Sequence, residues 1–352
     1  MNLESPDERG FAIEDPRGFL SRLTGDRHAQ GVILDEIQRA PSLLSYLQPL
    51  IDEDPRPGRW VLTGSQHLLV MQSVSQSLAG RAAIHRLLPL AWDEVQRFGS
   101  TPGSLDEAMF AGGYPRIHDQ RLDPSQWLGG YVDTYVERDV RTLSNVGDLL
   151  TFQRFLGLCA GRTAQLLNAS SLASDAGVSQ PTAKAWMSIL ETGFIVQSIA
   201  PWFANIGKRL IKSPKLHLVD TGLACWLLGI RSAAQIASHP LRGMLFETWT
   251  TMEIVKQRAN RGERAGVHHY RDASGREADV VVENGPDLAI VDAKASATIT
   301  GDMTGRVDTV ARLIAASPSH RPRPMLVYGG DETTQRSGVE IVAWRDLHTR
   351  AW

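Results

Sequence analysis

Two groups of acidic residues in this sequence have the types and the spacing to bind a divalent cation. The first is Asp35-Glu36, which follows the apolar run Val32-Ile33-Leu34. A carboxylate at the end of a buried strand is a common ligand for the Mg²⁺ ion of a bound nucleotide, so we expect Asp35 to position the metal. Glu36 would then orient and polarise the attacking water. The simpler alternative is that this pair caps the helix that follows.

Two further segments fit the same nucleotide site. Thr63-Gly64-Ser65 ends the next apolar run, where a small polar residue such as Ser65 can contact the γ-phosphate or the lytic water. Arg81 has the charge to stabilise the phosphate as an arginine finger or sensor. We therefore expect Asp35, Ser65 and Arg81 to contact ATP and its Mg²⁺ ion, with Glu36 as the catalytic residue.

The second acidic group lies in the last third of the chain. Asp279 belongs to one apolar run, and Asp292-Ala293-Lys294 ends the next run after a turn at Asn284-Gly285-Pro286. Asp292 and Lys294 are two residues apart and so share one strand face, with Asp279 on the neighbouring strand. Glu247 comes from the preceding long helix. We expect Asp279 and Asp292 to bind Mg²⁺ or Mn²⁺, and Lys294 to position water or stabilise the phosphate.

This spacing matches the D-x(n)-[DE]-x-K pattern of the restriction-endonuclease-like fold, in which the acids bind one or two Mg²⁺ ions. Glu277 and Gln257 are second-tier candidates for the same site. The alternative is a surface hairpin that carries an incidental acid and lysine. Such folds also persist as binding modules after they lose activity, although Glu247, Asp279 and the other residues needed for chemistry are all present here.

The first acidic group is positioned by a strand–helix–strand unit. Residues 31–37 and 59–64 are short apolar runs of strand length, and Leu43, Leu44, Leu47, Leu50 and Ile51 recur between them at helical spacing. Both runs are apolar on both faces, as the buried strands of a parallel sheet are. This unit predicts a parallel α/β sheet.

The middle of the chain has two patterns. Residues 96–162 read as helical, and residues 163–215 resemble a winged helix: a helix and tight turn over 172–179, a second helix over 180–191 and a strand over 193–199. Polar residues at the start of the second helix are where such modules read bases. Five basic residues are expected to reach phosphates: Lys184, Lys208, Arg209, Lys212 and Lys215. The alternative is a packing module without nucleic-acid contacts.

The second acidic group is positioned by an α/β segment over residues 216–352. We expect a long helix over 241–258, strands over 268–271, 278–283 and 288–292, a helix over 303–316, and strands over 325–328 and 339–343. This order is consistent with a restriction-endonuclease-like fold, and the whole chain then reads as an α/β multidomain protein.

Composition sets limits on the partners. Of 352 residues, 37 are basic and 39 acidic, so the formal net charge of -2 gives no global reason to expect nucleic acid or a membrane surface as partner. The cysteines, Cys159 and Cys225, lie among apolar neighbours and indicate buried thiols in a reducing compartment. The N-terminus is acidic without an apolar run, and no stretch reaches the length of a membrane span. We expect a cytoplasmic protein with no membrane partner.

Several motifs in fixed order resemble a known family. These are Val32–Pro41, Leu62–Ser65, Ser77–Arg81, Gly112-Gly113-Tyr114-Pro115, 131–141 and 243–294. They closely resemble prokaryotic AAA-type ATPases that carry a C-terminal domain of unknown function, and that domain is similar to the nuclease fold. The resemblance implies ATP and Mg²⁺ as cofactors and possible assembly into a homo-oligomer, with an arginine that reaches across subunits.

One motif of that family does not occur in this sequence. The G-x-x-x-x-G-K-[ST] loop, whose N–H groups and lysine hold the phosphates, has no match. The only Gly-Lys pair, Gly207-Lys208, is followed by Arg209, and Trp202 stands where the first glycine is needed. We expect the first strand, loop and helix of the ATPase domain to be missing here, either because the start lies upstream or because this copy is degenerate. ATP would then bind poorly.

These observations combine into one arrangement with two functional hypotheses. The arrangement is a truncated P-loop ATPase domain over 1–95, a helical linker over 96–162, a winged-helix-like module over 163–215 and a nuclease-like domain over 216–352. The first hypothesis is an ATP-binding protein coupled to a nuclease-like domain that acts on nucleic acid. The alternative is a catalytically inactive DNA- or protein-binding regulator on a degenerate ATPase scaffold.

Overall fold

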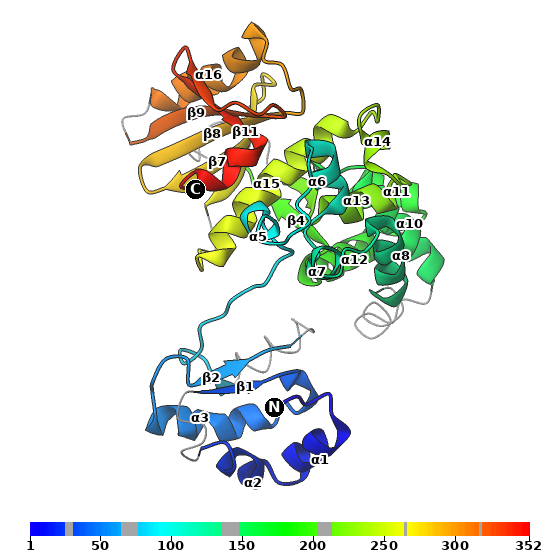
Figure 1. Cartoon of the computed structure of the whole chain (residues 1–352), viewed down its shortest axis with the longest axis vertical. Coiled ribbons are helices and arrows are strands. Elements are labelled where there is room, and N and C mark those ends of the chain that lie inside the picture. The colour runs from blue at the N-terminus through cyan, green and yellow to red at the C-terminus, as the bar shows by residue number, and fades with distance from the viewer. Residues whose placement is uncertain (25–30, 65–76, 136–147, 203–212, 264–265, 317–318) are drawn as a thin grey trace. The chain divides into compact units, whose positions relative to one another are not determined.

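The computed structural model describes residues 1–24, 31–64, 77–135, 148–202, 213–263, 266–316 and 319–352. The chain divides into two compact units, Met1–Ile84 and His85–Trp352, which are drawn in Figure 1. The expected positions Ser65, Lys208, Arg209 and Lys212 lie outside the described residues.

The first unit is built on a parallel pair of strands. Its elements are α1 (Pro6–Glu14), α2 (Pro16–Ser21), β1 (Val32–Leu34), η2 (Ile37–Arg39), α3 (Leu43–Glu53) and β2 (Trp60–Leu62). β1 and β2 pair in parallel, with Val32 opposite Trp60. The helix α3 buries Leu43, Leu44 and Leu47 against the strands. The strand–helix–strand unit predicted from the apolar runs is therefore confirmed, with shorter strands.

Short helices begin the second unit: α5 (Trp92–Val95), α6 (Leu105–Ala111), α7 (Pro115–Asp119) and α8 (Pro124–Tyr135). The Gly112-Gly113-Tyr114-Pro115 motif forms the turn between α6 and α7. The Gly113 N–H donates to Asp220 Oδ2 at 2.7 Å, and Gly112 has φ of 66°. A Cβ atom on Gly112 would lie 2.3 Å from Asp220 Oδ1. Position 112 therefore requires glycine, because this buried carboxylate lies where a Cβ atom would be.

Next come α10 (Leu149–Ala160), β3 (Gln165–Leu166), α11 (Ala169–Ala176), α12 (Gln180–Thr192), β4 (Val196–Ile199) and β5 (Lys215–Leu218). The strands form an antiparallel sheet in the order β3-β5-β4. Gly177 ends α11 in the left-handed region, and the Ser179 hydroxyl accepts from Thr182 N at the start of α12. The predicted helix–turn–helix is thus confirmed. The helices α13 (Thr221–Leu227) and α14 (Ala233–Ile236) follow.

The chain ends in a six-stranded mixed sheet with helices on both faces (Figure 1). Its elements are α15 (Arg242–Asn260), β6 (Val267–Arg271), β7 (Glu277–Asn284), β8 (Asp287–Lys294), α16 (Gly301–Ala315), β9 (Arg321–Tyr328), β10 (Thr334–Arg336), β11 (Val339–Ala343) and η4 (Trp344–Thr349). Along β7 and β8, side chains alternate between a core shared with α15 and a second core shared with α16. The strand order is β10-β11-β9-β8-β7-β6, with β8, β9 and β11 parallel.

The two sheets of the second unit are joined by backbone hydrogen bonds. Trp202 N donates to His269 O at 2.7 Å, and His269 N donates to Ala200 O at 3.0 Å. These bonds tie the segment after β4 to β6, so that the middle sheet is fixed to the C-terminal sheet. Both cysteines are buried and free, as predicted.

Candidate functional site

The fold brings together the acids predicted from the C-terminal spacing. Glu247 lies on α15, Asp279 on β7 and Asp292 on β8. Val280 pairs with Val291 on these antiparallel strands, so Asp279 and Asp292 follow at the same end of the strand pair. The N–H of Ala293 donates to Asp279 Oδ2 at 2.9 Å. The Asp292 side chain is fully buried, and the Lys294 ammonium lies 2.8 Å from its Oδ2 atom.

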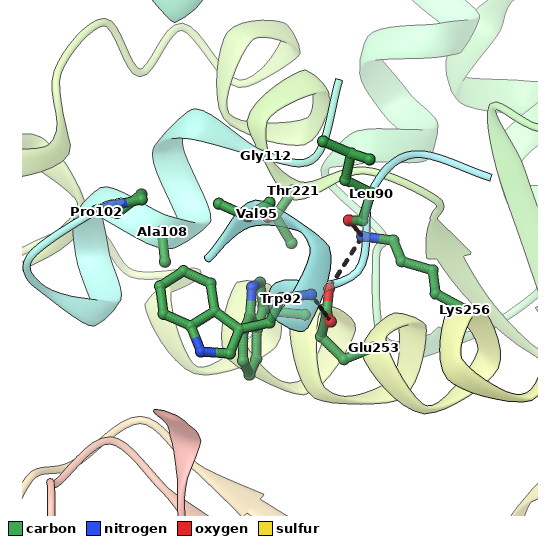
Figure 2. Close-up of a pocket in the computed structure, with 10 residues that line it drawn as sticks. Leu90, Trp92, Val95, Pro102, Ala108, Gly112, Thr221, Glu253 and Lys256 are labelled. Carbon is green, nitrogen blue, oxygen red and sulfur yellow. Dashed lines mark hydrogen bonds and ion pairs between the residues drawn. The ribbon is translucent and has the colours of Figure 1, made fainter. Parts of the chain in front are cut away.

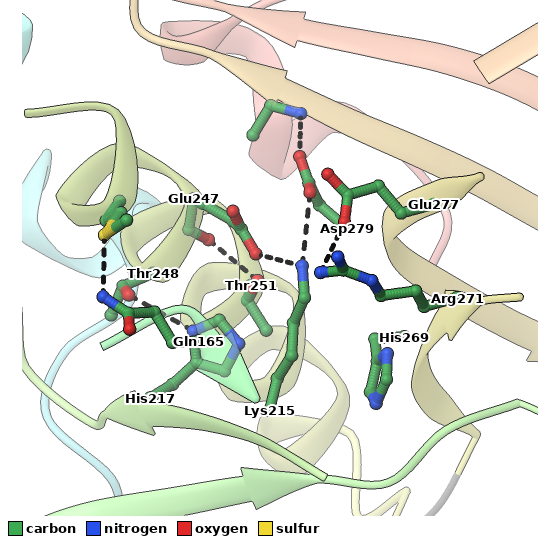
Figure 3. Close-up of polar contacts among 12 residues, drawn as sticks. Gln165, Lys215, His217, Glu247, Thr248, Thr251, His269, Arg271, Glu277 and Asp279 are labelled. Atoms are coloured by element: carbon green, nitrogen blue, oxygen red, sulfur yellow. Dashed lines mark hydrogen bonds and ion pairs between the residues drawn. The ribbon is translucent and has the colours of Figure 1, made fainter. Parts of the chain in front are cut away.

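Lys215 is the residue at this site that the sequence did not indicate. We expected it to contact phosphates at the surface, and this expectation is wrong, because its side chain is only 4% exposed. Its Nζ atom lies 2.6 Å from Glu247 Oε1 and 3.4 Å from Asp279 Oδ1 (Figure 3). The one signal in the sequence is a lysine that begins β5, in which two of the other three residues are leucines. The strand places the ammonium between acids from α15 and β7.

Burial and charge set the protonation of this cluster. Burial and the nearby Asp279 charge raise the pKa of Glu247 to about 8 and the pKa of Asp292 to about 7. Burial alone would raise the pKa of Asp279, but the charges of Lys215 and Lys294 hold it below its usual value. Burial opposes the charge on Lys215, yet Asp279 and Glu247 outweigh it and raise the pKa of Lys215. Asp279 and Lys215 are therefore the charged pair at neutral pH.

Further basic side chains surround the second-tier candidate Glu277. Arg271 Nη1 lies 3.2 Å from one Glu277 oxygen, and Arg306 Nη1 lies 3.4 Å from the other. Arg271 comes from β6 and Arg306 from α16, and the latter is 56% exposed. With the partly exposed Lys294, they form what we call the basic rim: Arg271, Lys294 and Arg306. Gln257, the other second-tier candidate, is buried in α15.

A chain of buried polar groups lies behind Lys215. His217 Nδ1 and the Thr248 hydroxyl are 3.2 Å apart (Figure 3). Thr248 and Thr163 share a hydrogen bond of 2.7 Å. Burial lowers the pKa of His217 to about 3, and the Lys215 charge acts in the same direction. Burial likewise lowers the pKa of His269 to about 4. Both imidazoles are therefore neutral at pH 7.

The acids do not form a metal-binding set. Among the residues that the structure describes, no group of three or more His, Cys, Asp or Glu side chains is arranged to hold a metal ion. At the C-terminal site, the Lys215 ammonium contacts the oxygens of Glu247 and Asp279 that a cation would need. The geometry therefore does not fit the divalent ion that the D-x(n)-[DE]-x-K spacing implies.

The N-terminal acidic pair follows β1. The Thr63 hydroxyl, which follows β2, donates to Asp35 Oδ1, so the ends of the two parallel strands are linked. Glu36 has φ of 59°, and Gln38 Nε2 donates to its Oε2 at 2.5 Å. Glu36 therefore begins the turn η2 in the left-handed region and does not cap a helix through its side chain.

Three family descriptions match consecutive parts of the chain. Residues 103–234 match a domain of unknown function (DUF8612), and residues 242–347 match another (DUF4143). Residues 1–96 match an AAA domain. These matches make the chain similar to AAA-type, ATPase-like proteins with a C-terminal domain of unknown function.

Two curated relatives extend this comparison. They are uncharacterized proteins of Mycobacterium bovis (strain ATCC BAA-935 / AF2122/97) and Mycobacterium tuberculosis (strain ATCC 25618 / H37Rv). Each is 32% identical to this chain over 273 residues, which is 77% of this chain and 59% of the relative. The matched region thus spans less than two thirds of the length of these relatives.

Within the AAA domain, Arg81 does not lie with Asp35. Arg81 Nε lies 2.6 Å from Asp52 Oδ1, at the end of α3. Because α3 begins after the carboxyl end of β1 and runs back along the strand pair, its last turn lies toward the opposite edge. Of the described residues predicted to share a nucleotide site, Asp35 and Glu36 therefore lie together after β1, with Thr63 beside Asp35, and Arg81 lies apart from them.

The last residues of the AAA-domain match belong to the second unit. There, Glu253 Oε2 accepts from Trp92 N at 2.6 Å, and Lys256 Nζ donates to Leu90 O at 3.0 Å (Figure 2). Glu253 and Lys256 also form a buried ion pair of 3.0 Å. Both lie on α15, the helix that carries Glu247, and they fix the segment at 90–92 to it. No helix among the described residues is long and apolar enough to cross a membrane.

Proposed function

We propose that this chain is an AAA-type, ATPase-like regulator that binds nucleic acid through its C-terminal unit and does not cleave it. The observation that supports the proposal is that the Lys215 ammonium lies between Glu247 and Asp279, with the Asp292–Lys294 ion pair next to Asp279. The four predicted residues support a nuclease-like fold. The lysine supports a function without a catalytic metal.

The order of elements supports the nuclease-like part. The helix α15 is followed by the antiparallel strands β6, β7 and β8, then by α16 and the parallel strand β9. This α-β-β-β-α-β order resembles the core of the restriction-endonuclease-like fold, with its acids on the first helix and the second and third strands. Folds of this kind act on nucleic acid, which defines the class of partner we propose.

The absence of cleavage is proposed from the charge at the site. Hydrolysis of a phosphodiester on this fold depends on Mg²⁺ or Mn²⁺ held by the acids. In this chain the Lys215 ammonium lies 2.6 Å from Glu247 and 3.4 Å from Asp279, and its side chain is buried. The acids are thus engaged by the protein itself.

Two surfaces support nucleic acid as the partner. The basic rim places Arg271, Lys294 and Arg306 around the acid cluster, where they can contact phosphates. The order α10-β3-α11-α12-β4-β5 and the sheet order β3-β5-β4 resemble those of a winged helix, and α12 exposes Gln180 and Lys184.

The basic rim gives a direct test of nucleic-acid binding. We expect the chain to bind fluorescently labelled DNA or RNA, with an affinity that falls as salt rises, because phosphate contacts release counterions. Arg271→Ala and Arg306→Ala are each expected to weaken binding about threefold to tenfold, the effect of losing one phosphate contact of about 1 kcal/mol. Fluorescence anisotropy over a salt series measures both effects.

Arg312→Ala is the matched control. Arg312 lies on the same helix as Arg306 and also pairs with an acid, Asp308, but it is 79% exposed and does not contact Glu277. Its loss should leave the affinity unchanged within about twofold. Absence of binding to any DNA or RNA at low salt, or equal effects of the Arg306 and Arg312 substitutions, would rule out the proposed surface.

A further inference from the structure

The cation and the acids of the C-terminal site come from different parts of the fold. Glu247 and Asp279 belong to α15 and β7, which enclose one core of the six-stranded sheet. Lys215 belongs to β5, the central strand of the three-stranded sheet. Its partners lie 32 and 64 residues further along the chain. The ammonium is therefore inserted into the acid cluster from outside the nuclease-like core (Figure 3).

The ammonium and a divalent ion cannot occupy this cluster together. Mg²⁺ and Mn²⁺ bind carboxylate oxygens at about 2.1 Å. An ion bound to Glu247 Oε1 and Asp279 Oδ1 would therefore lie in the space between these oxygens, where the Lys215 nitrogen already lies 2.6 and 3.4 Å from them. The two cations are mutually exclusive on steric grounds, and their positive charges would also repel each other.

Formal charge gives the same result. At the centre of the cluster, the Asp279 carboxylate and the Lys215 ammonium are the charged pair, 3.4 Å apart. Their unit charges cancel without a metal. Replacing Lys215 by a neutral side chain would leave a surplus negative charge among largely buried carboxylates, the condition under which an added cation binds.

We propose that Lys215 is the internal cation of this cluster, and that a neutral side chain at position 215 converts Glu247 and Asp279 into a divalent-cation site. The inference rests on the proposed function only for the comparison with a metal-binding nuclease fold. The test of this inference measures metal binding. The inference can therefore fail while the proposed nucleic-acid binding is confirmed, and nucleic-acid binding can fail while the inference is confirmed.

The wild-type chain provides the first arm of the test. Binding of Mn²⁺ is followed by the loss of the electron paramagnetic resonance signal of free Mn²⁺, for wild type and for Asp279→Asn. We expect the two chains to bind Mn²⁺ equally, because Lys215 already engages Asp279. This arm does not depend on any variant of Lys215. Wild-type Mn²⁺ binding that Asp279→Asn abolishes would overturn the proposal.

The second arm removes the ammonium. Lys215→Met should bind one more Mn²⁺ per chain than wild type, at least tenfold more tightly than any wild-type site, and its melting temperature should rise when Mn²⁺ is added. Lys215→Met/Asp279→Asn should lose both effects. The matched control is Lys215→Arg, which keeps the positive charge and should gain no site. A folded Lys215→Met that binds no additional Mn²⁺ contradicts the proposal.

Folding of Lys215→Met is itself informative. Removal of one partner from a buried ion pair is strongly destabilising, so the variant is refolded both with Mn²⁺ and with a chelator. Recovery of folded chain in Mn²⁺ alone supports the proposal, since the metal then replaces the ammonium. Failure to fold in both buffers counts against it, because the cluster would accept no cation except lysine.

Discussion

At the scale of single residues, the C-terminal site depends on side chains that neutralise one another. Asp279 receives the Ala293 N–H at 2.9 Å and lies 3.4 Å from the Lys215 ammonium. These contacts keep its pKa low, while burial raises the pKa values of Glu247 and Asp292. The site therefore keeps one firmly ionised carboxylate beside a buried lysine.

The residues that meet at the site could be predicted only in part. Asp279, Asp292 and Lys294 follow from strand spacing, because side chains two residues apart share a face. Lys215 could not be predicted, because its partners are distant in the sequence and only the packing of β5 against α15 and β7 brings them within reach. A buried lysine in such a strand needs a partner for its ammonium, but the sequence does not show which residue is that partner.

We predict that His217 makes the stability of the second unit depend on pH. Its pKa of about 3 lies below the usual 6.5, so the unfolded chain binds a proton that the folded chain does not. The stability from this group is complete above about pH 6.5 and is lost as the pH falls toward 3. We expect His217→Gln, which keeps a hydrogen-bonding group beside Thr248, to reduce the loss of stability as the pH falls. At pH 5 the contribution of His217 to this loss should be about 2 kcal/mol in the free energy of unfolding.

Urea unfolding of the second unit from pH 7.5 to pH 4.5 measures this effect. Part of the loss of stability at low pH should remain in the variant, because His269 is also buried and its pKa is also lowered. The charged groups that act on His217 are Lys215 and Asp279, and both are unchanged in this variant. His85→Gln, at an exposed histidine, is the control and should leave the profile unchanged. Parallel pH profiles for wild type and His217→Gln would show that His217 does not contribute.

At the scale of elements, the regular segments could be predicted from periodicity. The second helix of the middle module was expected over 180–191 and is Gln180–Thr192, and the strand expected over 288–292 is Asp287–Lys294. β10 could not be predicted, because Thr334–Arg336 is polar and exposed. It is a strand because it pairs with β11, which is a tertiary cause.

We predict that the Gly112-Gly113 turn limits which residues the second unit tolerates at position 113. A Cβ atom on Gly113 would lie 2.4 Å from the Leu90 carbonyl oxygen, whose backbone cannot move away easily. Leu90 is itself held by Gly113 O and Lys256. We therefore expect Gly113→Ala to destabilise the second unit by about 1–3 kcal/mol, the usual cost of overpacking. The measurement is the urea midpoint of this unit.

Gly130→Ala is the control for this substitution. Gly130 lies in α8 with nothing within 4 Å of its Cβ position. Alanine has the higher helix propensity, so this variant should be neutral or more stable by about 0.5–1 kcal/mol. An equal loss of stability in both variants would show that close approach to Leu90 is not the reason for glycine at 113.

At the scale of the whole molecule, the two acidic groups belong to two different compact units. The unit 1–84 holds Asp35 and Thr63 at the ends of parallel strands, and the unit 85–352 holds the acid cluster. One buried core in the second unit includes Trp92, Phe155, Trp249 and Trp344. The modules expected over 96–162, 163–215 and 216–352 stay predictions, because changes of periodicity mark elements and do not show which of them share a core.

We propose that the C-terminal unit binds nucleic acid without a catalytic metal. The most direct measurement uses the full chain with end-labelled single- and double-stranded DNA and RNA, in chelator, Mg²⁺ or Mn²⁺. Anisotropy follows binding, and a denaturing gel follows strand length. We predict affinities in chelator and in Mg²⁺ that agree within about twofold at equal ionic strength, and intact strands throughout. Cleavage in Mg²⁺ or Mn²⁺ that is lost in Asp279→Asn would contradict it.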